Sequence, residues 1–266
     1  MPLLGHAALV TGASRGLGLG IVQALAGAGA EVWAVAEDGP ELERACALVA
    51  GPGPVHPVVA DLRRRDEAGR AVDAVRRARP DLTALVNNAA VLPIRPLADT
   101  DDLVWDEALA VNLTAPFICI REALPLLRVR GGSIINVSSR AGITGFADET
   151  AYCATKFAIE GLTRAAALEL AALGISVNTV TPGARIKPTG LDQAAFDALP
   201  AADRAGYRDP ATFGPAITVL ARLRGQPSGL RFDLARLTDD VRRLGAEVAL
   251  SQLASLAEAP TLTFPD

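Results

Sequence analysis

Short apolar runs alternate with longer amphipathic stretches along most of the chain. The runs are almost continuously apolar, as expected for strands of a parallel sheet that helices cover on both faces. In the stretches between them, apolar residues recur at the spacing of a helix. The pattern predicts strands at 6–11, 31–36, 55–60, 82–87, 133–138 and 175–181, and helices at 16–28, 40–50, 64–79, 100–128 and 150–173.

This regular alternation implies parallel strands that right-handed crossovers connect. With a further strand at 229–234, the predicted fold class is α/β, a Rossmann-like doubly wound parallel sheet of about seven strands with helices on both faces. Pro116 is expected to break or kink the helical stretch that contains it. No linker or repeat interrupts the pattern, so residues 1–266 are predicted to form a single domain.

The pattern loosens after the sixth predicted strand. A long irregular segment in a compact domain is usually a functional lid or binding loop, so a substrate loop is predicted at about 184–213. Residues 238–257 are predicted to be helical, with Thr238 or Asp239 as N-cap, inside a C-terminal extension of about 234–266. The irregular segment is punctuated by Pro188, Pro200, Pro210 and Pro215.

Composition narrows the classes of function. Half of the residues (50%) are hydrophobic, which suffices for a large core, and the net charge of −4 predicts no strong attraction to nucleic acid or to an anionic membrane. No apolar run is long enough for a membrane span, and the N-terminus has no signal-peptide pattern. One cluster of arginines has acidic residues interleaved with it and is interpreted as a solvated helix face. It comprises Arg63, Arg64, Arg65, Arg70, Arg76, Arg77 and Arg79.

Cysteine and histidine are sparse. Cys46, Cys119 and Cys153 are odd in number and follow no spacing pattern, which suits a reducing cytosol and predicts a cytoplasmic protein. His6 and His56 are isolated from each other and from the cysteines. No metal site is therefore expected.

Catalytic chemistry is indicated by a tyrosine and a lysine four residues apart. The chain has only two tyrosines, and Tyr152 precedes Lys156 by one helical turn. Residues at this spacing share a helix face, and a nearby ammonium lowers the pKa of a phenol, which is ordinarily about 10. Such a phenol is better suited to general acid–base catalysis near neutral pH. The alternative is a lysine whose stem merely covers a half-buried ring.

Two further features surround this pair in the sequence. Ser139 ends a predicted strand, so its hydroxyl could hydrogen-bond a substrate oxygen next to the tyrosine. The segment Thr11–Gly18 lies between the first predicted strand and helix, where glycines let the backbone approach a pyrophosphate at a helix N-terminus. Its spacing is Gly-x-x-x-Gly-x-Gly, and although any tight turn can require glycine, its position favours a cofactor site.

Taken together, these motifs resemble the short-chain dehydrogenase/reductase family, in its form of about 250 residues. The resemblance extends from residue 6 to about residue 190 in the family's order and spacing, with Ser139 lying 13 positions before Tyr152. The matching segments are Thr11–Gly18, Asp61-Leu62, Asn87-Asn88-Ala89-Ala90, Asn112, Ser139, Tyr152, Lys156 and Pro182-Gly183.

The resemblance implies a role for each catalytic residue. Ser139 would hold the substrate oxygen, and Tyr152 would give or take its proton. Lys156 would bind the nicotinamide ribose and lower the pKa of Tyr152. Asn112 would kink its helix and hold a water that leads from Lys156 to solvent.

The resemblance also implies the cofactor site. Asp61 would accept a hydrogen bond from the adenine amino group, with the Leu62 backbone nearby, and Asn87 and Ala89 would steady the riboses and the central strand. The glycines would line the pyrophosphate. The full expected set is Gly12, Ser14, Arg15, Gly16, Leu17, Gly18, Glu37, Asp61, Leu62, Asn88, Ala89, Tyr152, Lys156, Pro182, Gly183 and Thr189.

Acidic residues after the second predicted strand bear on the choice of dinucleotide. NAD-specific relatives carry Asp at the position of Ala36, whereas here Glu37 and Asp38 follow it. A carboxylate in this region accepts from the ribose 2′-hydroxyl and repels a 2′-phosphate. Arg15 favours the opposite choice because it can meet that phosphate. The prediction is NAD, with NADP as the alternative.

The chain departs from the family in several places. Ala90 replaces a usual Gly, and Lys187 stands where a Thr usually contacts the nicotinamide, so Thr189 is assigned that role. The usual Asp-Gly-Gly near the C-terminus is replaced by 228–233. The positions expected to face the substrate are 91–94, 140–146 and the segment from 184 to about 213, and most of them are apolar. Arg140 and Arg185 are charged exceptions. Either could bind an acidic substrate group, or they could contact cofactor phosphate or solvent.

The predicted function is an NAD(P)-dependent oxidoreductase acting on CH–OH groups, which interconverts a secondary alcohol and a ketone. One alternative is a 3-oxoacyl-thioester reductase, although the basic entry that its carrier phosphates need is not identifiable in the sequence. Another is a non-catalytic nucleotide-sensing protein, which would not need all four catalytic residues. The expected partners are a small-molecule alcohol or ketone and further copies of the chain in a homo-oligomer, a dimer or a tetramer.

Overall fold

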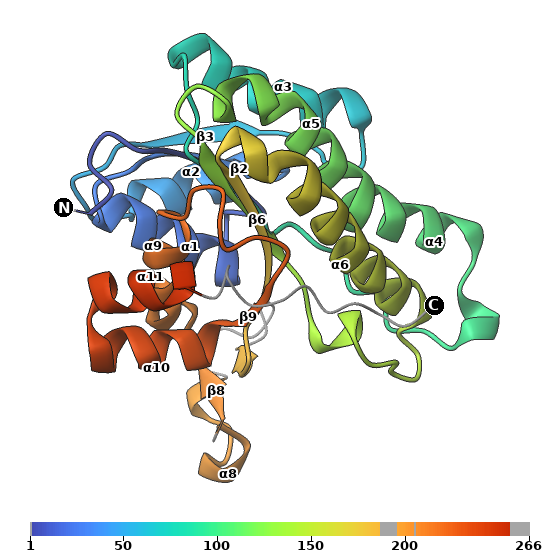
Figure 1. Ribbon diagram of the computed structural model, residues 1–266. Coiled ribbons are helices and arrows are strands. Elements are labelled where there is room, and N and C mark those ends of the chain that lie inside the picture. The colour runs from blue at the N-terminus through green and yellow to red at the C-terminus, as the bar shows by residue number, and fades with distance from the viewer. Residues whose placement is uncertain (1, 187–195, 205, 256–266) are drawn as a thin grey trace, which may run out of the picture.

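The computed structural model describes residues 2–186, 196–204 and 206–255. Its centre is a seven-stranded sheet in the order β3-β2-β1-β4-β5-β6-β9, and every neighbouring pair is parallel (Figure 1). This confirms the predicted doubly wound α/β fold. The strands are β1 Ala7–Thr11, β2 Glu31–Ala36, β3 Val55–Val59, β4 Ala84–Asn87, β5 Gly132–Val137, β6 Ile175–Thr181 and β9 Arg231–Asp233.

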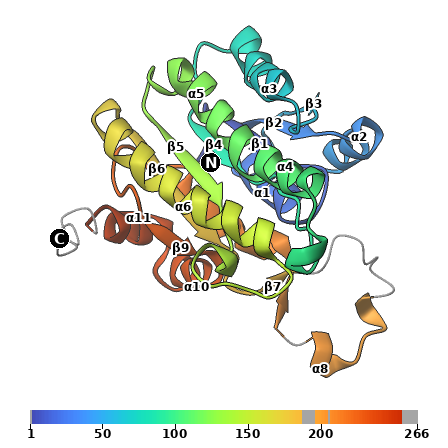
Figure 2. The same cartoon turned by 90° about the vertical axis from the view of Figure 1, so that its right-hand side faces the viewer.

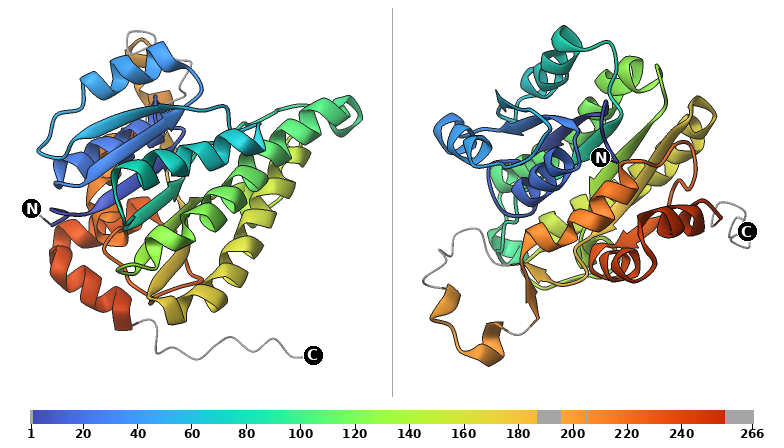
Figure 3. Two further views of the ribbon diagram at one scale, coloured as in Figure 1. Left: turned by 90° about the horizontal axis from the view of Figure 1, so that it is seen from above. Right: turned by 90° about the vertical axis from the view of Figure 1, so that its left-hand side faces the viewer.

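Helices cover both faces of the sheet, as the views in Figures 2 and 3 show. One hydrophobic cluster lies beneath the first group of helices and another beneath the second. The first group is α1 Gly16–Gly27, α2 Gly39–Ala47, α9 Gly214–Leu220, α10 Leu234–Leu244 and α11 Ala246–Ser255, and the second is α3 Arg65–Ala78, α5 Ala115–Leu127 and α6 Thr150–Leu170.

Strand β1 shows why the runs are almost continuously apolar. Ala8 and Val10 join the cluster under α1, whereas Ala7 and Leu9 join the cluster under α3 and α5. Successive side chains of a strand point to opposite faces, and here both faces are buried. Burying one leucine such as Leu9 stabilises the fold by about 1.5–3 kcal/mol.

The topology places a crevice at the carboxyl end of β1. Strands β2 and β3 lie on one side of β1, and β4 lies on the other. Chain connections therefore diverge to opposite sides at this point, which is where open α/β sheets bind their ligands. The glycine turn follows β1 directly.

The stretch 100–128 forms two helices without a gap between them. Helix α4, Asp102–Leu109, continues through a π-helical turn, Ala110–Thr114, into α5. Pro116 does not end the helix, but it follows the π-helical turn directly, so the regular α-helical hydrogen bonding is interrupted at this place in the chain. The combined helix Asp102–Leu127 is long and apolar enough to cross a membrane by length and composition alone, but part of it is buried against the sheet and α3.

The C-terminal helices differ from the prediction. The N-cap is Asp233, whose carboxylate accepts from the backbone N–H of Arg236 at 2.9 Å. The predicted caps Thr238 and Asp239 therefore lie inside α10, because β9 ends earlier than the apolar pattern suggested. Side chains of α10 and α11 contribute to the hydrophobic core, so the described part of the predicted extension packs as an integral layer.

The predicted substrate loop contains a small second sheet. Strand β7, Arg185–Ile186, pairs in parallel with β8, Tyr207–Arg208, and the short helix α8, Ala201–Arg204, precedes β8. Figure 2 shows β8 and α8 projecting away from the main body. The guanidinium of Arg208 bonds both carboxylate oxygens of Asp239, at 3.2 and 3.1 Å, and so ties this part to α10.

Candidate active site

The glycine turn is packed too closely for side chains. Gly12 has φ +66°, and a Cβ on Gly18 would lie 1.9 Å from the Gly12 carbonyl oxygen. The Asn88 amide donates to the carbonyls of Thr11 and Gly12, at 2.9 and 3.1 Å. Asn88 therefore braces the turn while it also lines the adjoining cavity. Bare backbone faces this cavity, as close approach of a pyrophosphate requires.

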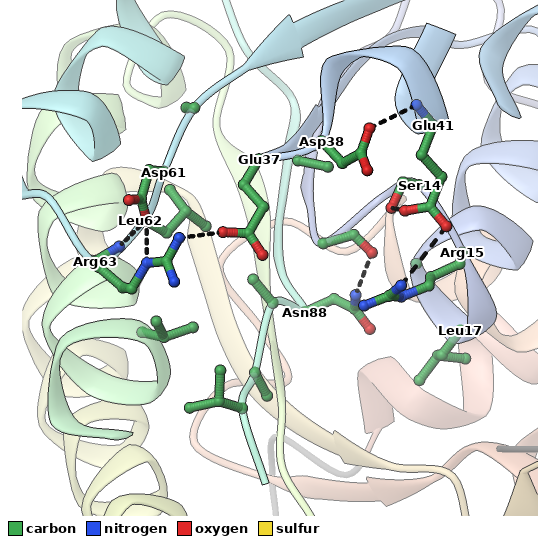
Figure 4. A pocket seen from close by; sticks show the side chains of 18 of the residues that line it. Ser14, Arg15, Leu17, Glu37, Asp38, Glu41, Asp61, Leu62, Arg63 and Asn88 are labelled. Atoms are coloured by element: carbon green, nitrogen blue, oxygen red, sulfur yellow. Dashed lines mark hydrogen bonds and ion pairs between the residues drawn. The ribbon is translucent and has the colours of Figure 1, made fainter. Parts of the chain in front are cut away.

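The cavity measures about 400 Å³ and lies at the carboxyl ends of β1, β2, β3 and β4 (Figure 4). Its size and mixed polar and apolar lining suit part of a dinucleotide. Ten of the predicted cofactor-binding residues line it: Gly12, Ser14, Arg15, Leu17, Gly18, Glu37, Asp61, Leu62, Asn88 and Ala89. Gly16, Tyr152, Lys156, Pro182 and Gly183 lie outside its lining, and Thr189 lies outside the described residues.

Arg63 is a cavity residue that the sequence analysis misassigned. Its guanidinium is not simply solvated, because it forms ion pairs with Glu37 and with Asp61, the latter at 2.8 Å (Figure 4). A third ion pair joins it to Glu107 at 3.5 Å. The hydrogen bond from Arg63 is the main reason that the pKa of Asp61 is lowered. Its place directly after Asp61-Leu62 was the available signal. The two carboxylates expected to contact adenosine are thus already bridged by one cation.

A second charged group lies at the glycine turn. The Ser14 hydroxyl donates to Glu41 at 2.9 Å, and the Arg15 guanidinium lies 3.6 Å from the same carboxylate. Asp38 accepts from the Glu41 backbone N–H at 2.8 Å and thereby caps α2. Glu41 was not predicted, and it partly neutralises the arginine that would favour a 2′-phosphate.

Tyr152 and Lys156 lie together on α6, as their spacing predicted. The Lys156 amine is 5.4 Å from the centre of the Tyr152 ring and donates to the Val137 carbonyl at 2.8 Å. The side chain is buried, with 3% exposure, and burial lowers its pKa from 10.5 to about 8. Burial also raises the pKa of Tyr152, opposed by a hydrogen bond with Ser139. The expected lowering of the Tyr152 pKa is therefore wrong, because desolvation is the larger effect.

Ser139 and Asn112 are held by their surroundings. The Ser139 hydroxyl accepts from the Ala141 backbone N–H at 3.2 Å and so begins a short 3₁₀ turn beside α6. Asn112 lies inside the π-helical turn, where its amide group bonds both backbone groups of Val91 at 2.8 and 2.9 Å. It also donates to the Thr155 hydroxyl at 3.1 Å. Asn112 thus connects the edge of the cavity to the residue next to Lys156.

The remaining predicted residues have structural contacts. The Asn87 side-chain amide donates a hydrogen bond of 2.8 Å to the side-chain oxygen of Asn136 on the neighbouring strand, so it steadies the sheet. Gly183 has φ +67°, and a Cβ there would lie 1.9 Å from the carboxylate of Asp233. Arg140 stacks on Phe146 at 5.3 Å, and Arg185 stacks on Tyr207 at 4.7 Å. Each arginine thus has an aromatic partner within the protein, and binding of an acidic substrate group by either one stays a hypothesis.

The buried lysine predicts a pH dependence of stability. Since its pKa is about 8 in the folded chain and 10.5 when free, the unfolded chain binds more protons between these values. The free energy of unfolding should therefore rise as the pH increases from about 8 to 10.5. This gain in stability should be lost again as the pH falls back toward 8. Urea unfolding at pH 7, 8, 9 and 9.5 should show a steeper rise for the wild type than for Lys156→Met. Parallel profiles for the two proteins would contradict the assigned burial.

Comparison with known proteins gives the same picture. The short chain dehydrogenase family model matches residues 6–198. The chain is 38% identical to galactitol 2-dehydrogenase of Agrobacterium fabrum over 189 residues, which cover 69% of this chain and 72% of that protein. It is 36% identical to D-beta-hydroxybutyrate dehydrogenase of Cupriavidus necator over 190 residues, covering 70% and 73%. A solved metagenomic short-chain oxidoreductase in complex with NADP superposes with TM-score 0.74 at 30% identity, covering 88% of this chain and 99% of that chain.

The doubly wound sheet and the glycine turn that lines the cavity at its carboxyl edge are features of a Rossmann-type dinucleotide-binding fold. The match to the family model and the similarity to named dehydrogenases then assign the chain to a family. The chain belongs to the short-chain dehydrogenase family, as its motifs indicated.

Proposed function

We propose that this protein interconverts a secondary alcohol and a ketone with an NAD(P) cofactor. The observation that carries the proposal is the buried Lys156 amine, which lies 5.4 Å from the centre of the Tyr152 ring on the same helix face. Ser139 acts on the same tyrosine, since it opposes the rise of the Tyr152 pKa that burial causes. A cavity with a glycine-rich wall adjoins this group through Val91 and Asn112. The names of its dehydrogenase relatives support a hydroxyl-bearing substrate.

The residues have distinct proposed roles. When bound, the nicotinamide supplies or accepts the hydride. Ser139 orients the substrate oxygen toward the phenol of Tyr152. Burial keeps that phenol protonated, which suits donation of a proton to a ketone oxygen in the reduction direction. Lys156 supplies a positive charge that is fixed by its bond to the Val137 carbonyl and stabilises the phenolate left behind.

The cofactor preference is proposed to be NAD. The cavity wall carries Glu37, Asp38 and Glu41, and both of its arginines, Arg15 and Arg63, already contact carboxylates. A 2′-phosphate would have to displace these acids. A screen of alcohols and ketones, followed by absorbance of the reduced nicotinamide, should give higher kcat/KM with NADH than with NADPH. Glu37→Gln should narrow the difference, and a clear preference of the wild type for NADPH would overturn the proposal.

The other two hypotheses can be separated in the same assays. A 3-oxoacyl-thioester reductase should use 3-oxoacyl-CoA better than the ketones, although Arg15 and Arg63 are engaged with acids and do not form a free basic entry. A nucleotide-sensing protein should bind NADH without turning over any substrate. Assembly into a dimer or tetramer and a cytoplasmic location remain predictions.

A further inference from the structure

A charged network lies directly behind Ser139. Its centre is Glu160, which is 3% exposed and lies one helical turn after Lys156 on α6. One carboxylate oxygen accepts from the Ser138 hydroxyl at 2.6 Å, and the other accepts from the Thr179 hydroxyl at 3.0 Å. The carboxylate therefore links α6 to the ends of β5 and β6.

Arg231 completes the network from the edge strand. It begins β9, in the segment where this chain departs from the family's usual Asp-Gly-Gly. One guanidinium nitrogen donates to Glu160 and to the Ser138 hydroxyl, and the other donates to the Ser139 carbonyl at 2.7 Å. Its side chain is only 20% exposed. A planar guanidinium can hold two acceptors at a fixed separation, which a lysine ammonium cannot.

The Ser139 carbonyl therefore accepts two hydrogen bonds. Besides Arg231, the Gly142 backbone N–H donates to it at 2.9 Å and closes the 3₁₀ turn. This turn packs tightly on α6, because a Cβ on Gly142 would lie 2.7 Å from the Ser138 hydroxyl and 2.9 Å from the Lys156 carbonyl. The position of the serine is thus determined on one side by α6 and on the other by Arg231.

The surrounding charges leave Arg231 as the principal partner of the carboxylate. The Lys156 amine donates to the Val137 carbonyl, and Glu160 acts on it only as a nearby charge that raises the pKa of Lys156. Arg164 reaches Glu160 only at 3.8 Å, and its side chain is 61% exposed. Removing one partner of a buried ion pair leaves the other charge buried and uncompensated, so Glu160 depends on the Arg231 guanidinium.

We propose that Arg231 is a positioning residue that fixes Ser139 for catalysis. Glu160 orients the guanidinium, and the guanidinium holds the Ser139 carbonyl, so that the hydroxyl is directed at the substrate oxygen. This inference rests on the proposed function for its kinetic consequence. Its structural consequence, a rigid 139–144 turn, can be measured without any substrate.

The informative variant is Arg231→Lys. Lysine keeps the positive charge for Glu160 but cannot also hold the Ser139 carbonyl, so the fold should persist and the turn should loosen. We expect kcat to fall by about tenfold to 100-fold, as for other small misplacements of a reacting group. The affinity for NADH, measured by fluorescence titration, and the melting temperature should stay close to wild type. Hydrogen exchange by mass spectrometry should be faster in 139–144 and unchanged in α1.

Arg222→Lys is the matched control. Arg222 is 19% exposed and pairs with Glu247 through two bonds of 2.8 and 2.9 Å, but it contacts neither Ser139 nor the cavity. The same substitution there should change neither kcat nor exchange in 139–144. Arg231→Met, which removes the charge as well, should lower the melting temperature in addition to kcat.

The outcomes separate the two proposals. Wild-type kcat and wild-type exchange in Arg231→Lys would overturn the positioning role. Equal losses of kcat, NADH affinity and protection throughout the chain would also overturn it, since they indicate general destabilisation. If the wild type turns over no alcohol or ketone, but the exchange in 139–144 still rises in Arg231→Lys alone, the proposed function fails and the positioning of Ser139 stands.

Discussion

Replacing Tyr152 by phenylalanine should lower kcat by about 10²–10⁴-fold, the usual contribution of a positioned proton donor. The ring contact with the Lys156 amine, 5.4 Å from the ring centre, does not need the hydroxyl, so packing on α6 should be preserved. Only the phenolic hydroxyl is lost, which is the group proposed to transfer the proton. The measurement is the steady-state rate on the best substrate of the alcohol and ketone screen.

Binding measurements complete this experiment. The affinity of Tyr152→Phe for NADH and its melting temperature should stay near those of the wild type, because the buried lysine and the cavity are unchanged. A kcat equal to that of the wild type would mean that another group transfers the proton, and the mechanism proposed above would be wrong. Ser139→Ala should show a smaller loss in the same direction.

Replacing Gly18 by alanine should weaken cofactor binding by at least about tenfold, or about 1.4 kcal/mol. The added Cβ would lie 1.9 Å from the Gly12 carbonyl oxygen and 2.6 Å from the Asn88 amide nitrogen. The nearer of these two neighbours is a backbone atom, so the turn itself must move, and overpacking of this kind costs about 1–3 kcal/mol. Fluorescence titration with NADH and urea unfolding measure the two effects.

Gly27→Ala is the matched control, since Gly27 is the last residue of the same helix. A Cβ there meets no atom within 4 Å. Alanine should leave NADH affinity unchanged and stabilise the helix by up to about 0.5–1 kcal/mol. If Gly18→Ala behaved in the same way as this control, the glycine turn would not be the cofactor site.

The strands and their order of alternation with helices were predictable because both sheet faces are buried. The inner strands therefore need apolar side chains at nearly every position, as in β1 and β2, and such runs are visible without any structure. The boundaries were less predictable. Asp233 is both the last residue of β9 and the N-cap of α10, and an apolar pattern that continues through Leu234 does not reveal that boundary.

Arg63 and Arg231 show which contacts of the candidate site could not be predicted from the sequence. Arg63 was one of several arginines among acids, and only the approach of β2, β3 and α4 reveals that its partners are Glu37, Asp61 and Glu107. Arg231 lies 92 positions from Ser139, so no local pattern connects them. Pairing of distant charges depends on side-chain geometry, which sequence spacing does not encode.

The amino-acid sequence by itself determined the doubly wound sheet, the glycine turn at its centre and the shared helix face of Tyr152 and Lys156. These are local properties, because strand burial, turn conformation and helical periodicity are each set within a few neighbouring residues. The tertiary structure alone decided the electrostatics. Burial raised the pKa of Tyr152 and lowered that of Lys156. The fold also brought Arg231 and Glu160 together behind Ser139. Desolvation and long-range ion pairing depend on what the whole fold packs around a group.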